Sequence, residues 1–205
     1  MPGPCDPSNY ESSYTQVGSD RVDLRIHPDF PPTPAQLEAV RAALRLIPQA
    51  HLRDFDQQGG YVQFSRPGCT PTHGGGHNPG PDPWIRLSHD CLTKGYNAAI
   101  SATLLHEMGH IVNTEYHAMD SIRAADREGY QLLAHTRHDG TTQGPDESFA
   151  DCYMIYLITQ RAHRRYRHRA DLAAYQGENA TRRFQAMLRS SAFRSASTTT
   201  LTPLH

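Results

Sequence analysis

LLHEMGHIV at residues 104–112 places two histidines four positions apart inside an apolar stretch. At 3.6 residues per turn, His106 and His110 leave one face of a helix and can bind a single tetrahedral ion. Glu107 lies about 100° further round the helix, which suits a general base that accepts a proton from metal-bound water. The pattern H-E-x-x-H therefore predicts a zinc ion with a catalytic carboxylate beside it.

The surrounding residues predict that this motif lies in a buried amphipathic helix. Residues 97–105 contain neither proline nor glycine and run directly into the motif. Apolar side chains then recur at helical spacing: Leu104, Leu105, Met108, Ile111 and Val112. The alternative is that His106 and His110 are ordinary core residues and Glu107 is solvated.

A third metal ligand is predicted at Glu147, within PDESFAD at residues 145–151. Pro145 suits the first turn of a helix, where the helix dipole stabilises a carboxylate. Asp151 lies one turn further on the same face and could accept a hydrogen bond from a metal-bound histidine. The alternative is an acidic first turn on an ordinary amphipathic helix.

These residues resemble the zincin superfamily of metallopeptidases, and the order H-E-x-x-H…E-x-x-x-D is similar to its gluzincin branch. The resemblance implies that His106, His110 and Glu147 bind one catalytic Zn²⁺. It also implies that Glu107 is the base and that Asp151 supports a ligand. The expected fold is therefore zincin-like.

The spacing narrows the branch of the family. The separation between His110 and Glu147 is longer than in thermolysin-like enzymes and nearer to toxin-type branches, such as clostridial neurotoxin light chains. The three-histidine metzincin pattern fails because its third position falls on Tyr116. By analogy we expect a bacterial toxin or effector peptidase domain, such as those on type VI secretion spike proteins.

The expected fold class is α+β. Alternating residues at 21–26 and short apolar runs at 60–64 and 84–87 predict strands. We expect a small mixed sheet of about three to four strands, packed on the active-site helix, and then a mainly helical lower half.

Further helices follow from capping and periodicity. Thr33 is a favourable N-cap, Pro34 suits the first helical position, and Gln36 completes a capping box. Residues 121–135 and 171–190 are expected to form two more helices.

The length of 205 residues favours a single domain. Residues 1–20 lack an apolar run and are predicted to be a disordered arm rather than a signal peptide. Residues 21–194 would form the metallopeptidase domain and residues 195–205 a frayed tail. No segment approaches the roughly 18 apolar residues that a membrane helix needs. We therefore expect a soluble protein, whose export would need a dedicated secretion system.

Net charge of −1 argues against bulk attraction to nucleic acid or anionic membranes. The arginine-rich run at 161–169 leaves a nucleic-acid-binding protein as one alternative, although such runs are typical of a solvated helix face. A non-catalytic, zinc-stabilised binding module is the other alternative. We expect a monomer, or an effector module of a larger secreted protein.

The cysteines and the loop between them are less informative. Three pairings are open to Cys5, Cys69, Cys91 and Cys152, of which Cys69–Cys91 would close a long loop in an oxidising compartment. Residues 69–81 are rich in glycine and are expected to form a mobile surface loop or a lid. His73 and His77 lie in this loop, where their spacing has no helical meaning; a second metal site there is the alternative.

The predicted function is a zinc-dependent metallopeptidase that holds a polypeptide substrate extended in a cleft. Glu107 would take a proton from water and pass it to the leaving amine. The substrate would pair with a sheet edge at 60–64 or 84–87. A donor to the oxyanion is expected among Tyr116, His117, Tyr130, His135 and His138. Tyr130 and His138 are the preferred catalytic candidates.

Overall fold

The computed structural model describes residues 5–69, 75–94, 97–133, 135–136, 142–161 and 180–196. The chain forms two compact units, residues 1–111 and 112–205, and each is described by itself. Helix α4 (Asn97–Glu115) runs through the boundary between them. The predicted α+β class is confirmed. A single domain at residues 21–194 stays a prediction.

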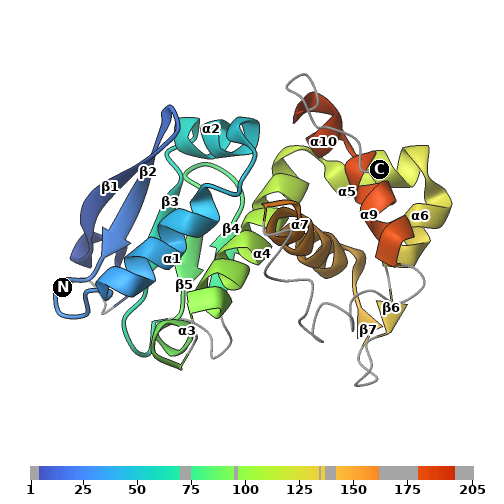
Figure 1. Ribbon diagram of the computed structural model, residues 1–205. Helices are drawn as coiled ribbons and strands as arrows, with labels where there is room; N and C mark the ends of the chain where they lie inside the picture. The colour runs from blue at the N-terminus through green and yellow to red at the C-terminus, as the bar shows by residue number, and fades with distance from the viewer. Residues whose placement is uncertain are drawn as a thin grey trace. The chain divides into compact units, whose positions relative to one another are not determined.

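The first unit is built on a five-stranded mixed sheet with strand order β1-β2-β3-β5-β4 (Figure 1). Its strands are β1 (Glu11–Val17), β2 (Asp20–Ile26), β3 (Tyr61–Phe64), β4 (Gly75–Asn78) and β5 (Trp84–Leu87). Strands β2, β3 and β5 are parallel, whereas β1 and β4 are antiparallel to their neighbours. All four residues of β3 are buried, as expected for the centre of a sheet covered by helices.

The two edge strands are absent from the sequence prediction, which expects three to four strands. Residues 1–20 are not simply a disordered arm, because residues 11–17 form β1. The first four residues of β1 are exposed, so no apolar alternation reveals it. Strand β4 lies inside the expected surface loop and reads GGHN, a composition that disfavours strands. Both strands are specified by pairing with a neighbour rather than by their own residues.

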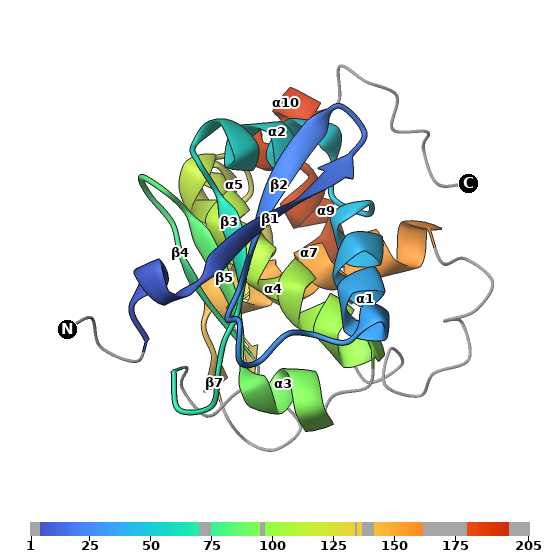
Figure 2. The same ribbon diagram turned by 90° about the vertical axis from the view of Figure 1, so that its left-hand side faces the viewer.

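Helices α1 (Pro34–Leu44) and α4 lie on the same side of this sheet (Figures 1 and 2). The predicted start of α1 is confirmed, since the Thr33 and Gln36 side chains accept each other's backbone N–H in a capping box. The Ser101 hydroxyl of α4 donates to the Ala39 carbonyl of α1 over 3.0 Å. The remaining helical segments are η1 (Pro7–Asn9), α2 (Gln49–Gln57) and α3 (His89–Lys94). The predicted apolar stripe of α4 is buried: Leu104, Leu105, Met108 and Ile111.

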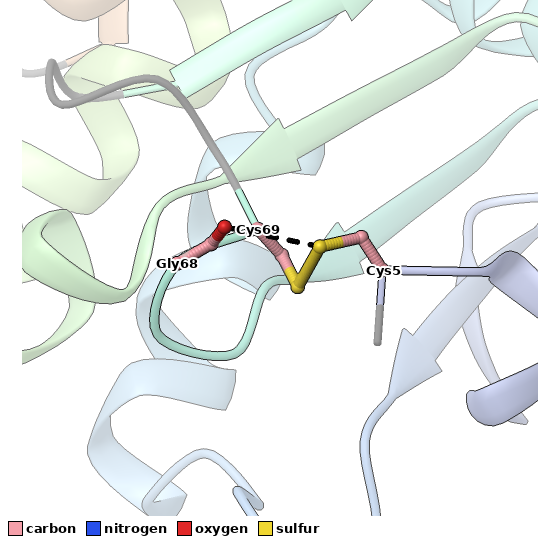
Figure 3. The surroundings of a disulfide bond; sticks show 3 residues. All are labelled: Cys5, Gly68 and Cys69. Atoms are coloured by element: carbon pink, nitrogen blue, oxygen red, sulfur yellow. Dashed lines mark hydrogen bonds between the residues drawn. A yellow bond between two sulfur atoms is a disulfide. The ribbon is translucent and has the colours of Figure 1, made fainter. Parts of the chain in front are cut away.

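One disulfide joins Cys5 to Cys69 in the first unit (Figure 3). The Cys69–Cys91 pairing is therefore wrong. Cys91 is a buried free thiol whose Sγ lies 3.6 Å from the Thr103 hydroxyl, and burial raises its pKa. Sequence spacing cannot choose among pairings because the choice depends on which segments the fold brings together.

The second unit is mainly helical, as predicted for the lower half. It contains α5 (Ala118–Ala125), α6 (Arg127–Leu133), α7 (Pro145–Arg161), α9 (Ala180–Leu188), α10 (Ser191–Ala196) and the short antiparallel pair β6 (His135–Thr136) and β7 (Thr142–Gln143). Tyr153 and Tyr156 of α7 pack against Phe193 of α10 in its core.

One helix prediction for this unit needs correction, and a second is tested only in part. The single helix expected at 121–135 is two helices, α5 and α6, which are separated at Asp126. The Asp126 carboxylate accepts the N–H of Gly129 over 2.8 Å, so it caps the second helix. The helix expected at 171–190 is α9 over residues 180–188; residues 171–179 lie outside the described part of the chain. Among the described residues, no helix combines the length and the apolarity that crossing a bilayer requires.

Candidate metal centre

The middle of α4 brings the nitrogens of His106 and His110 together. Their Nε2 atoms are 3.2 Å apart, and their ring planes are inclined by 80°. Two ligands about 2.0–2.1 Å from a tetrahedral ion are separated by about 3.3 Å. Because the rings are nearly perpendicular, the lone pairs, which lie in the ring planes, can converge on one point. These two predicted ligands could therefore hold a metal ion between them.

Glu107 follows His106 in the chain and is held by a partner from the sheet. Its side chain is only 12% exposed, and its Oε2 lies 2.8 Å from Nδ1 of His77. An ionised carboxylate can only accept, so the His77 ring donates in this hydrogen bond. The predicted base is thus a nearly buried carboxylate with a histidine donor.

His77 reaches α4 from the edge strand β4, and its ring is stacked on that of His110. The ring centroids are 4.4 Å apart and the planes differ by 10°. A candidate ligand atom from each of His77, Glu107 and His110 lies within 4.8 Å of the others. However, stacked rings direct their lone pairs in parallel planes, which cannot meet at one ion about 2 Å from both nitrogens. We therefore interpret His77 as a hydrogen-bond partner of Glu107 and not as a metal ligand.

Gly75 lets β4 approach α4 closely. A Cβ atom at Gly75 would lie 2.7 Å from Cγ2 of Thr103 and 3.0 Å from the carbonyl oxygen of Arg86. It would also lie 3.2 Å from Oε1 of Glu107. Side chains two apart on a strand share a face, so positions 75 and 77 both face the base. A side chain at position 75 would therefore crowd the Glu107 carboxylate from the same strand that carries His77.

Sequence reasoning missed His77 because a glycine-rich context predicts a loop. One signal was present: NPGPDP at residues 78–83 is a turn sequence directly before β5. A turn that precedes a strand is expected to join it to an antiparallel partner. Tracing β5 back through this turn would have predicted a strand that contains His77.

The sheet-edge prediction for the substrate is wrong in its choice of strands. Residues 61–64 form the central strand β3, and residues 84–87 form β5, which pairs with both β3 and β4. Their backbone groups are used within the sheet. The edge on the side of Glu107 is β4, which pairs with β5 alone among the described strands.

Glu147 and Asp151 lie on α7 in the second unit. This helix begins at Pro145, as predicted, and Glu147 is exposed in its first turn, while Asp151 is buried. The neighbouring Asp146 accepts a hydrogen bond of 2.6 Å from the side-chain amide of Asn113. The roles of Glu147 as a ligand and of Asp151 as its support stay predictions.

The two preferred oxyanion donors also stay predictions. The Tyr130 hydroxyl accepts a hydrogen bond of 2.6 Å from the guanidinium of Arg123, and this bond raises the pKa of Arg123. The Tyr130 hydroxyl proton is not used in that contact. His138 lies outside the described residues, as do residues 162–169 of the arginine-rich run.

The first unit therefore offers two convergent imidazoles for an ion and, beside them, a carboxylate placed to accept a proton. This arrangement can hold a metal ion and can carry out acid–base chemistry next to it. No known family model matches the chain, and no curated protein is similar enough to match it.

Proposed function

We propose that this protein is a zinc-dependent metallopeptidase of the zincin type. The observation that carries the proposal is the 3.2 Å separation of the His106 and His110 Nε2 atoms, with Glu107 beside them in a nearly buried position. Two histidines and a carboxylate are a usual ligand set of catalytic zinc, with a fourth position left for water. Ligand chemistry and the H-E-x-x-H spacing both favour zinc.

Glu147 is the proposed third ligand. It lies in the first turn of α7, at the end of the helix dipole that attracts negative charge. The side chain of the neighbouring Asp146 accepts a hydrogen bond from Asn113, which lies on α4 three residues after His110. This hydrogen bond lies within the second unit and holds the first turn of α7, which carries Glu147.

The proposed chemistry divides the work between the ion and the chain. Bound zinc supplies a Lewis acid that polarises a peptide carbonyl and makes water more acidic. Glu107 takes up a proton on its carboxylate and later delivers it to the leaving amine. Tyr130 and His138 stay the proposed donors to the oxyanion. An extended polypeptide pairs with the edge of β4, where main-chain hydrogen bonds hold it without regard to its sequence. A toxin or effector role is the proposed context.

The test combines metal content with proteolysis. Zinc per chain is measured in wild type, Glu107→Ala and His110→Ala, and each protein is incubated with fluorescein-labelled casein. We expect one zinc in wild type and in Glu107→Ala, loss of zinc in His110→Ala, and cleavage by wild type alone. Cleavage by Glu107→Ala would overturn the proposal. Stoichiometric zinc without any cleavage of casein or of a denatured cell extract would favour a binding module.

A further inference from the structure

We propose that His77 is a positioning residue that holds the general base from strand β4. The inference deepens the proposed function and rests on it, since Glu107 must be the base. The hydrogen bond from His77 Nδ1 to Glu107 Oε2 joins residues 30 positions apart in the chain, so the fold alone brings them together.

The hydrogen bond restricts a side chain that would otherwise move. Glutamate has several rotatable bonds, and ordering such a side chain costs rotamer entropy. A catalytic group works only when it is held within about 0.5 Å of the productive position. The donor from His77 holds Oε2 of this carboxylate, and a Cβ atom at Gly75 would lie 3.2 Å from Oε1, so the glycine leaves room for the second oxygen. The hydrogen bond orients Glu107 before substrate arrives.

His77 is itself kept in place by a second contact. Its ring lies flat against that of His110, with the planes differing by only 10°. The stack fixes the ring plane, and the plane fixes the direction of the Nδ1–H donor. The same stack prevents His77 and His110 from binding one ion together. His77 thus acts through Glu107 and not through the metal.

The position of His77 also couples the base to the sheet edge. Strand β4 has four residues, and among the described strands it pairs with β5 alone. A peptide that adds to its free edge bonds to the backbone of the strand whose side chain holds Glu107. Strand β4 therefore aligns substrate and base relative to each other.

The experiment compares two substitutions at one position. His77→Leu removes the donor, whereas His77→Asn retains an N–H that can reach the carboxylate. With fluorescein-labelled casein, we expect His77→Leu to lower kcat by about 10- to 100-fold, the usual cost of losing an outer-shell partner, with KM changed less than about twofold. His77→Asn should recover most of the lost kcat. His89→Leu, the same change on α3, is the matched control and should leave kcat unchanged. All variants should retain zinc.

A second measurement separates this inference from the proposed function. In the zinc-loaded protein with ¹⁵N-labelled histidine, a protected ring N–H resonance should be absent from His77→Leu and from Glu107→Ala but present in His89→Leu. If wild type cleaves nothing, the proposed function fails, and this resonance alone decides whether His77 holds Glu107. Persistence of the resonance in Glu107→Ala would overturn the inference. So would loss of zinc from His77→Leu, which would make His77 a ligand, or equal kcat in His77→Asn and His77→Leu.

Discussion

Glu107 in the middle of α4 and Glu147 at the start of α7 are both glutamates, but their surroundings differ. Glu107 is 12% exposed and accepts a hydrogen bond from His77. Glu147 is exposed in the first turn of its helix, where the dipole favours negative charge. A held carboxylate beside an ion suits proton transfer, whereas an exposed carboxylate at a helix start suits a ligand. Surroundings, and not residue type, separate the two proposed roles.

The most direct way to break this comparison is Glu107→Ala. Loss of a general base should lower the turnover of labelled casein by about 10²- to 10⁴-fold, while zinc per chain stays at the wild-type value. Turnover and metal content are measured on the same preparation. A fall in zinc content would mean that Glu107 is a ligand, and the division of roles would be lost.

Glu147→Gln tests the proposed role of Glu147 as a zinc ligand. If Glu147 binds zinc, its neutral amide should weaken zinc affinity by more than about 100-fold, since outer-shell partners alone account for about 10- to 100-fold. Competition with a chromophoric chelator measures the affinity. Asp146→Asn is the matched control, because it removes the neighbouring charge from the same turn. An unchanged zinc affinity in Glu147→Gln would remove Glu147 from the site.

Gly75→Ala sharpens the account of how Glu107 is held. The new Cβ would press on Thr103 and on the backbone of Arg86, so we expect about 1–3 kcal/mol lower free energy of unfolding and reduced turnover. At Gly76 a Cβ would meet only the Trp84 ring, at 3.8 Å. Gly76→Ala should therefore change the stability by less than about 0.5 kcal/mol. Urea unfolding measures both variants, and similar losses would show that the close approach at Gly75 is unimportant.

The smallest expected effect concerns Cys152 of α7. This residue is buried, whereas Glu147 on the same helix is exposed. Burial raises the pKa of the Cys152 thiol from 9.0 to about 12. The unfolded chain therefore loses this proton first as pH rises above 9, and stability present below pH 9 should fall towards pH 12. Cys152 should contribute at most about 2 kcal/mol of this fall between pH 8 and 10.5, at 1.36 kcal/mol per pKa unit. Urea unfolding of Cys152→Ala should show a smaller pH dependence. An equal dependence would contradict the buried, protonated thiol.

Local chemistry explains what could be predicted. The helix around His106 is predicted by the helical spacing of its apolar residues. The starts of α1 and α7 are predicted by Thr33 and Pro145, because caps and first turns depend on neighbouring residues. The edge strands could not be predicted in this way. Strand β4 has two glycines and exists through its pairing with β5. The contact of His77 with Glu107 depends on that pairing, and the turn sequence at residues 78–83 was its one signal in the sequence.

The place of β4 at the edge of the sheet has a consequence for which proteins the proposed peptidase would cut. An edge strand pairs only with a chain that is already extended and whose own backbone groups are free. Residues inside helices or sheets of a folded target do not meet that condition. Selection would then depend on the conformation of the target rather than on its side chains. Linkers, loops and transiently unfolded segments would be cleaved. A stable folded target would resist cleavage, because its segments rarely unfold.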